Sequence, residues 1–234
     1  ATWSFCQRYA SEHGEHSSQY QVRVLGIVPS QAEETYIGRD AIVEATNRPI
    51  PKDAQNPVMI CVDPAWSEVG DETGILAYDP THDCIRNVKK IRGLKPMDLA
   101  RHLKRLALPD QWGAFKIRVE VDGMGIGPFD ILRDHQQQHT DRWDDQAYRN
   151  NRDLWLWPTP PDQMPELEGC FMAEQWHDKK NYASKKSECW AYMKRGLRTL
   201  AIPPSLAQDF YEIATVKYEP DDAGRLKIEP KKDY

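Results

Sequence analysis

Residues 115–127 read FKIRVEVDGMGIG, an alternating apolar strand that runs into Asp122 and then into a glycine-rich turn. Residues 58–65 read VMICVDPA and repeat the arrangement, with Asp63 at the end of the strand. A carboxylate at the tip of a buried strand is costly unless a positive charge lies beside it. Two such tips on neighbouring strands therefore predict a divalent-cation site.

The segment between these two strands predicts a mixed sheet. An antiparallel meander of three strands is expected over residues 58–63, 74–79 and 84–91. A helix is expected over residues 96–106, where apolar residues recur at helical spacing and a proline occupies the first turn. A strand that follows a helical crossover usually lies parallel to the strand before it. Residues 115–122 should therefore pair with residues 58–63, which brings both aspartates to one edge of the sheet.

The remaining segments predict helices around the sheet and a closing hairpin. The glycines after Asp122 should let the backbone approach the metal edge closely and open a helix that runs to about residue 139. Further strands are expected at 153–157, 214–219 and 225–229, and further helices at 37–47, 182–194 and 205–213. The last two strands should form the hairpin, because residues 220–224 read PDDAG, a turn sequence.

Composition fits one main globular domain. The chain has 234 residues, of which 40% are hydrophobic, and this is enough for a substantial core. The formal net charge of -5 argues against a general nucleic-acid coat, but Lys and Arg concentrate in residues 86–105 and 179–198. These two windows are typical of solvated faces when taken singly, and together they leave DNA contact open.

Cysteine usage and hydropathy predict a soluble intracellular protein. The 5 cysteines are an odd number without CxxC spacing, so we interpret them as reduced packing residues. No stretch approaches the roughly 20 apolar residues of a membrane-spanning helix. The chain begins at Ala1 without an initiator Met and ends just past a predicted strand, which suggests a domain of a longer protein. The pairs His13 with His16 and His135 with His139 have helical ligand spacing but no third ligand, so we interpret them as surface histidines.

Five segments, in this order, resemble the nuclease domain of the large terminase subunit, the DNA-packaging motor of tailed bacteriophages. Residues 20–29 are similar to the segment that joins the ATPase and nuclease halves of that motor. VDPA at 62–65 with GDET at 70–73 is similar to the first acidic motif, and VDGMGIG at 121–127 is similar to the second. YASKKSECW at 182–190 looks like a basic helix of the family, and GRLKIEPKKD at 224–233 looks like the closing strand and its lysine.

The resemblance implies an α/β fold of the RNase H-like class, in which a three-strand antiparallel meander and parallel strands form one mixed sheet flanked by helices. It implies that residues 1–53 are a linker from an ATPase domain outside the chain and that residues 54–234 are the nuclease domain. Two positions depart from the family pattern, since Ser184 replaces an expected asparagine and Lys186 an expected arginine. The family also carries an acidic cluster beyond the closing lysine, so we expect the C-terminal end of the domain, past Tyr234, to be missing.

The implied activity is metal-dependent endonucleolytic cleavage of double-stranded DNA, which cuts concatemeric genomes during packaging. Asp63 and Asp122 are the expected catalytic ligands of Mg²⁺ or Mn²⁺, with two ions in the complete site. Asp71 is the third expected catalytic ligand, although a solvated turn acid is an equal interpretation. We interpret Glu72 and Glu120 as ordinary surface or strand-face acids.

Lysines and partners follow from the same resemblance. Lys185, Lys186 and Lys231 are expected to contact DNA phosphates, with solvated surface charge as the alternative for each. The expected partners are double-stranded DNA and, in the complete protein, an ATPase domain, the portal and the small terminase subunit. The isolated domain should be monomeric, have no membrane contact and act in the host cytoplasm.

Two other function classes stay open. One is a different RNase H-like nuclease, such as a junction resolvase or a transposase. The other is a non-catalytic module that docks DNA or a portal while the acids hold a structural ion. A dinucleotide site is disfavoured, because the glycines after Asp122 lack the third glycine at the required spacing and an antiparallel meander precedes them.

Overall fold

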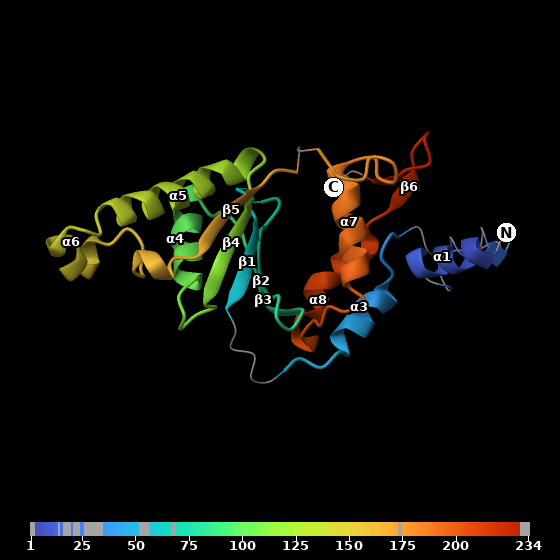
Figure 1. Ribbon diagram of the computed structural model, residues 1–234, viewed down its shortest axis with the longest axis horizontal. Helices are drawn as coiled ribbons and strands as arrows, with labels where there is room; N and C mark the ends of the chain where they lie inside the picture. Colours follow the sequence, from blue (N-terminus) through green and yellow to red (C-terminus); the bar gives the residue numbers. More distant parts are fainter. Residues whose placement is uncertain are drawn as a thin grey trace.

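A mixed sheet of five strands forms the centre of the computed structural model (Figure 1), with the order β3-β2-β1-β4-β5. The structure describes residues 3–13, 15, 20, 24–25, 35–51, 57–66, 69–172 and 175–229. The strands are β1 (Val58–Asp63), β2 (Thr73–Asp79), β3 (Cys84–Ile91), β4 (Ala114–Glu120) and β5 (Glu166–Cys170).

Strand directions confirm the predicted mixed sheet. β1 pairs antiparallel with β2, and β2 pairs antiparallel with β3, which is the expected meander. β4 pairs parallel with β1, and Val62 lies opposite Val119. β5 extends the parallel part on the far side of β4. The carboxyl ends of β1, β4 and β5 therefore meet at the same edge, as predicted for the first two.

The predicted strand at residues 153–157 is wrong. Its first part is a short 3-10 helix, η3 (Arg152–Leu154), and its backbone bonds to a neighbouring tyrosine instead of to the sheet, because Leu156 N donates to the Tyr148 hydroxyl at 2.9 Å. Trp157 is buried at 1% exposure and belongs to the core, as its apolar neighbours suggested. The fifth strand is β5 instead, a short segment that reads ELEGC and lacks a strong apolar pattern.

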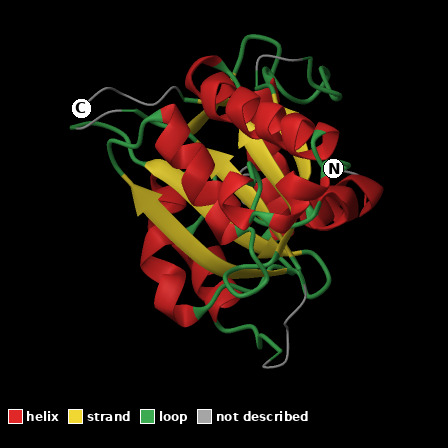
Figure 2. Cartoon of the chain, turned by 90° about the vertical axis from the view of Figure 1, so that its left-hand side faces the viewer, coloured by secondary structure: helices red, strands yellow, loops and turns green. Residues whose placement is uncertain are grey.

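Two long helices cover one face of the sheet (Figure 2). α4 (Pro96–Leu106) and α5 (Ile126–Asp141) occupy the positions predicted for them. Leu103 of α4 and Leu132 of α5 are fully buried in the same cluster as Ile117 and Val119 of β4. Alternate residues of β4 therefore face this apolar core, and the residues between them face the other side of the sheet.

A second core lies over the opposite face at β2 and β3. It contains α3 (Arg39–Thr46), α7 (Lys185–Gly196) and α8 (Ala207–Phe210), which lie together in Figure 1. Ile42 of α3 and Ile202 are fully buried in one cluster with Ile85 of β3. The segment predicted as a linker thus contributes α3 to this core, while its continuation into an ATPase domain stays a prediction.

The remaining elements are short, except for α1 (Trp3–His13). They are η2 (Gly123–Gly125), α6 (Gln146–Asn150), η4 (Pro161–Gln163), η5 (Pro204–Leu206), η6 (Tyr211–Thr215), β6 (Tyr218–Pro220) and β7 (Leu226–Ile228). β6 and β7 pair antiparallel, which confirms the closing hairpin. Residues 20–29, which resemble the joining segment of the family, lie mostly outside the described residues. In the described part of the chain, no helix has the length and apolar character needed to cross a membrane.

Candidate active site

Two carboxylates meet where β1 and β4 end. Because Val62 lies opposite Val119, the next residues along the two parallel strands, Asp63 and Glu120, are neighbours across the sheet. Val62 and Val119 are buried in the core under α4 and α5. The side chains of Asp63 and Glu120 therefore point to the opposite face of the sheet.

The pKa of Glu120 is raised by its surroundings, which include two other carboxylates. Burial raises the pKa of Glu120 to about 7, and the charge of Asp63, a hydrogen bond with Asp63 and the charge of Asp122 raise it further. Asp122 follows β4 by two residues and shares the strand face of Glu120. Acidic groups that converge in this way create a strongly negative point at the carboxyl edge of the sheet.

The glycine turn after Asp122 brings backbone against this edge, as predicted. Gly123 has a φ of 65°, a left-handed conformation that favours glycine. A Cβ atom at Gly125 would overlap the carbonyl oxygen of Glu120 and touch the ring of Pro64. The turn can pass over the ends of both strands only because Gly125 has no side chain.

A cavity of about 350 Å³ opens on the same face of the sheet. Its lining includes Cys61, Asp63, Lys90, Arg118, Glu120, Cys170, Asp209, Phe210 and Ile213. Phe210 comes from the second core, so this core forms one wall of the cavity while the sheet forms its floor. Burial raises the pKa of the Cys61 thiol, which keeps this sulfur protonated and supports its role as a packing residue.

The structure treats the three predicted metal ligands differently. Asp63 and Asp122 lie at the ends of β1 and β4 as expected, and both act on Glu120. Asp71 is exposed in the segment before β2. Of the three aspartates only Asp63 lines the cavity, since Asp122 and Asp71 are both absent from its lining. Within the described ranges, no three His, Cys, Asp or Glu side chains are grouped closely enough to hold a metal ion. The ligand roles of these three aspartates stay predictions.

Glu120 is the residue that sequence reasoning missed. Its interpretation as an ordinary strand-face acid does not fit its hydrogen bond with Asp63 at the edge of the sheet. A signal was present, because Glu120 is two residues before Asp122 and therefore lies on the same face of the strand. Glu72 does behave as a surface acid, since it accepts a hydrogen bond from Arg92 at 3.1 Å.

The structure describes two of the three lysines that are predicted to contact DNA. Lys185 is half-buried and its ammonium group donates to the carbonyl oxygen of Phe171, just past β5. Lys186 is exposed on the first turn of α7. Lys231 lies outside the described residues. Contact between these lysines and DNA stays a prediction.

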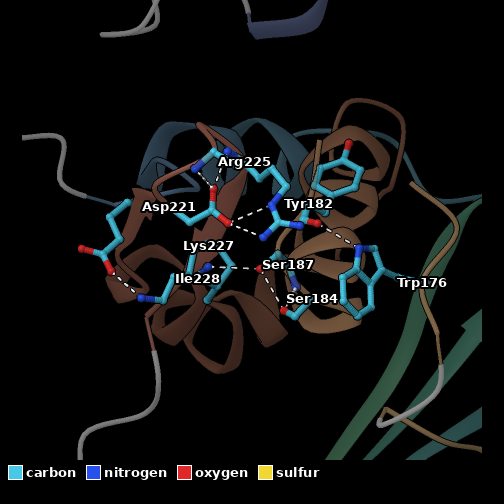
Figure 3. Close-up of polar contacts among 10 residues, drawn as sticks. Trp176, Tyr182, Ser184, Ser187, Asp221, Arg225, Lys227 and Ile228 are labelled. Atoms are coloured by element: carbon cyan, nitrogen blue, oxygen red, sulfur yellow. Dashed lines mark hydrogen bonds and ion pairs between the residues drawn. The ribbon is translucent and has the colours of Figure 1, made fainter. Parts of the chain in front are cut away.

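The start of α7 is fixed to the closing hairpin, as Figure 3 shows. Ser184 caps the helix by accepting a hydrogen bond from Ser187 N at 3.1 Å, so serine fills the capping role here. The hydroxyl of Ser187 accepts from Ile228 N at 3.2 Å. Arg225 and Asp221 close the hairpin turn with an ion pair of 2.7 Å. A hydrogen bond between Ser187 and Ile228 therefore joins the basic helix to the hairpin.

The interpretation of His139 as a surface histidine is wrong. Its side chain is fully buried, and its Nδ1 lies 2.6 Å from the hydroxyl oxygen of Tyr148. Burial lowers the pKa of His139, so the ring is a neutral packing group. His135 lies one turn earlier, and its Nδ1 atom is 2.8 Å from Lys104 Nζ. His135 and His139 therefore do not form a ligand pair.

Comparison with solved structures finds proteins of similar fold. The nuclease domain of the large terminase subunit gp2 of bacterial virus Sf6 matches with a TM-score of 0.56 and 15% identity, over 84% of this chain and 88% of that chain. The chain has the fold of a terminase nuclease domain. A mutant form of the Sf6 domain with calcium matches with a TM-score of 0.54 and 15% identity, over 83% of this chain and 88% of that chain.

A mutant form of the same Sf6 domain with manganese also matches, with a TM-score of 0.54 and 14% identity, over 83% of this chain and 88% of that chain. No protein-family model matches the chain, and no curated protein matches its sequence. The similarity therefore lies in the arrangement of the elements and confirms the RNase H-like mixed sheet.

Proposed function

We propose that the chain is a metal-dependent endonuclease that hydrolyses double-stranded DNA, the nuclease domain of a phage large terminase subunit. The observation that carries the proposal is the meeting of Asp63 and Glu120, with Asp122 nearby, at the carboxyl edge of a terminase-like sheet. Ligands commonly bind outside the carboxyl ends of parallel strands in α/β sheets. A carboxylate group at this edge is suited to a hard divalent cation.

The residues present fit Mg²⁺ or Mn²⁺. Carboxylate oxygens are the ligands that these ions prefer. A cation would offset both the burial of Glu120 and the charges of Asp63 and Asp122, which raise its pKa in that order. Asp63 and Glu120 would hold the first ion, and Asp122 would contribute to the same ion or to a second one. Asp71 is proposed as an outer ligand. The Sf6 neighbours with calcium and with manganese support a divalent ion in this fold.

When bound, the ions would activate a water molecule and neutralise the charge that grows on the phosphate. The chain's own groups act around them. Asp63 and Glu120 present oxygen ligands from adjacent rigid strands, which fixes their spacing. The turn at Gly125 keeps the end of β4 in place. Lys185, Lys186 and Lys231 are proposed to bind DNA phosphates outside the cavity.

The proposed biological setting is genome packaging. In the complete protein this domain would work with an ATPase domain, the portal and the small terminase subunit in the host cytoplasm. It would cut concatemeric DNA during packaging. The isolated domain is proposed to be a monomer.

Nicking of supercoiled plasmid in Mn²⁺ tests the proposal. The wild-type chain should nick and linearise the plasmid, whereas D63N and E120Q should not. D79N is the matched control, because it also neutralises an acid at a strand end but lies outside the cavity. Equal nicking by all three variants would refute the assignment.

Substrate choice separates the alternatives. Preference for a four-way junction over linear duplex would indicate a resolvase. DNA binding with no metal-dependent cleavage under any condition would indicate a docking module.

A further inference from the structure

A second polar feature of the cavity floor is the guanidinium group of Arg118. Arg118 lies on β4 opposite Cys61 of β1 and Glu168 of β5. It precedes Glu120 by two residues, so both side chains project from the same face of the strand, and both line the cavity. Successive side chains on one face of a strand are about 6.6 Å apart. Arg118 is therefore the positively charged neighbour of Glu120 on the same face of β4.

One side of this guanidinium is firmly anchored. Its Nη2 donates to both carboxylate oxygens of Glu168, at 3.0 and 2.9 Å. The Lys116 ammonium group also contacts Glu168 at 3.2 Å and Glu166 at 3.1 Å. The hydrogen bond from Arg118 lowers the pKa of Glu168, which keeps this carboxylate charged. The planar group is thus held in one orientation on the cavity floor.

The same guanidinium has a donor without a protein partner, although the side chain as a whole is 41% exposed. Its Nε is buried and has no hydrogen-bond partner among the described residues. The neighbouring thiols of Cys61 and Cys170 do not accept from it. A buried donor without a partner is rare in native proteins and calls for an explanation such as an absent ligand. Lys90, the other cation of the lining, differs because its ammonium group contacts Glu212 at 3.2 Å and Asp209 at 3.6 Å.

We infer that Arg118 binds a backbone phosphate of the cleaved DNA strand, next to the phosphate that is cut. A partly exposed guanidinium group held in a fixed plane suits a phosphate oxyanion. A DNA strand that places one phosphate at Asp63 and Glu120 continues along the cavity floor, and its next phosphate meets Arg118. This inference rests on the proposed function, and it adds a residue that orients the strand.

DNA binding in EDTA tests the inference separately from cleavage. A fluorescently labelled duplex is titrated with the full chain, and the affinity is measured by anisotropy at several salt concentrations. R118Q should bind about 10-fold more weakly, and the slope of log affinity against log salt should fall by about 1 because one phosphate contact is lost. R101Q is the matched control, since Arg101 is 71% exposed on α4, behind the sheet, and should bind like wild type.

R118Q leaves the Glu168 carboxylate without its arginine partner, which affects stability. The double variant R118Q/E168Q is therefore measured beside it. The double variant keeps the net charge of the wild type and leaves no unpaired carboxylate. It should show the same loss of affinity and of salt slope. Wild-type affinity and slope in the double variant, or an equal loss in R101Q, would overturn the inference. A chain that binds DNA through Arg118 but never cleaves it would refute only the proposed function.

Discussion

Two strands of the sheet end in the same dipeptide, Asp63-Pro64 after β1 and Asp79-Pro80 after β2, but the two ends differ in chemistry. Because β1 and β2 are antiparallel, the two aspartates lie at opposite edges of the sheet. Asp63 meets the carboxyl group of Glu120. Asp79 meets hydrogen-bond donors and a cation. The local sequence does not distinguish the two strand ends. The residues that contact each aspartate in the folded chain do distinguish them.

The Asp79 carboxylate is completely satisfied by its surroundings. Its side chain is fully buried and accepts hydrogen bonds from Thr81 N at 2.9 Å and His82 N at 3.3 Å. The Nδ1 atom of His82 lies 2.9 Å from Oδ2 of Asp79, and the Nε atom of Arg86 lies 3.7 Å from the same oxygen. Burial alone would raise the pKa of Asp79, but the bonds from His82 and Thr81 outweigh it and lower the pKa. This edge stabilises the turn between β2 and β3.

The comparison shows how a strand-end acid acquires a function. An acid among donors is a structural cap, whereas acids that face one another are stabilised by a shared proton or by a bound cation. Glu188 supports the first half of this rule. It is 2% exposed and accepts from the backbone N–H groups of His177 and Asp178, so it is a structural acid of α7.

The largest expected effect separates the two edges directly. D63N or E120Q should lower single-turnover cleavage by more than about 100-fold, since even residues that only orient metal ligands contribute 10- to 100-fold. D79N should cleave at the wild-type rate per folded molecule. The measurement is plasmid cleavage in Mn²⁺, normalised to the folded fraction by circular dichroism. A rate in D79N as low as that in D63N would remove the distinction between the edges.

A smaller effect is expected from the turn over the metal edge. G125A places a methyl group against the Glu120 carbonyl oxygen and should displace the end of β4. Cleavage should fall by up to about 100-fold, the cost of misplacing a catalytic group by about 1 Å.

G196A is the control for G125A, because a Cβ at Gly196 meets nothing within 4 Å. It should leave cleavage unchanged and raise stability by up to about 1 kcal/mol, the usual gain when alanine replaces glycine in a helix. Unchanged cleavage in G125A would show that the turn does not position Glu120.

At the opposite edge the expected effect is on stability. D79N should lower the free energy of unfolding by about 1–3 kcal/mol at neutral pH, because it removes charged hydrogen bonds from a buried group. Urea denaturation followed by tryptophan fluorescence measures this. Stability equal to wild type would mean that the Asp79 network is energetically neutral.

The smallest effect is the acid dependence of that difference. The pKa of Asp79 is lower in the folded chain than the value of about 3.9 in an unfolded one. Its stabilisation is therefore present above about pH 4 and is lost as the pH falls through the folded value. The stability gap between wild type and D79N should be constant from pH 7 to about 5 and shrink below about 4. A gap that grows in acid would contradict this sign.

Sequence patterns predicted the sheet well because its strands carry strong alternation. β1, β2 and β3 start and end within one residue of the predicted positions, and the parallel placement of β4 followed from the crossover helix. β5 was missed, since a short strand of mixed polarity has no strong local signal. The segment at 153–157 was misread because its alternating Trp and Leu residues do not pair with a strand. Leu156 N donates to the Tyr148 hydroxyl, and Trp157 packs in the main core.

The candidate site was predicted less completely for a related reason. Asp63 and Asp122 could be found because each ends an apolar strand before a turn. Glu120 could not be ranked by local sequence, since its importance depends on the register that sets it beside Asp63. Arg118 was outside the predicted basic windows, and only its place in the cavity and its unused donor single it out.

Mn²⁺ binding tests the central claim most directly. Electron paramagnetic resonance of Mn²⁺, titrated with the full chain without DNA, measures bound ion independently of cleavage. Wild type and D79N should bind Mn²⁺ with the same affinity, and E120Q should bind at least about 10-fold more weakly. Equal binding by wild type and E120Q would contradict the account, because it would place the ion away from the edge where β1 and β4 end.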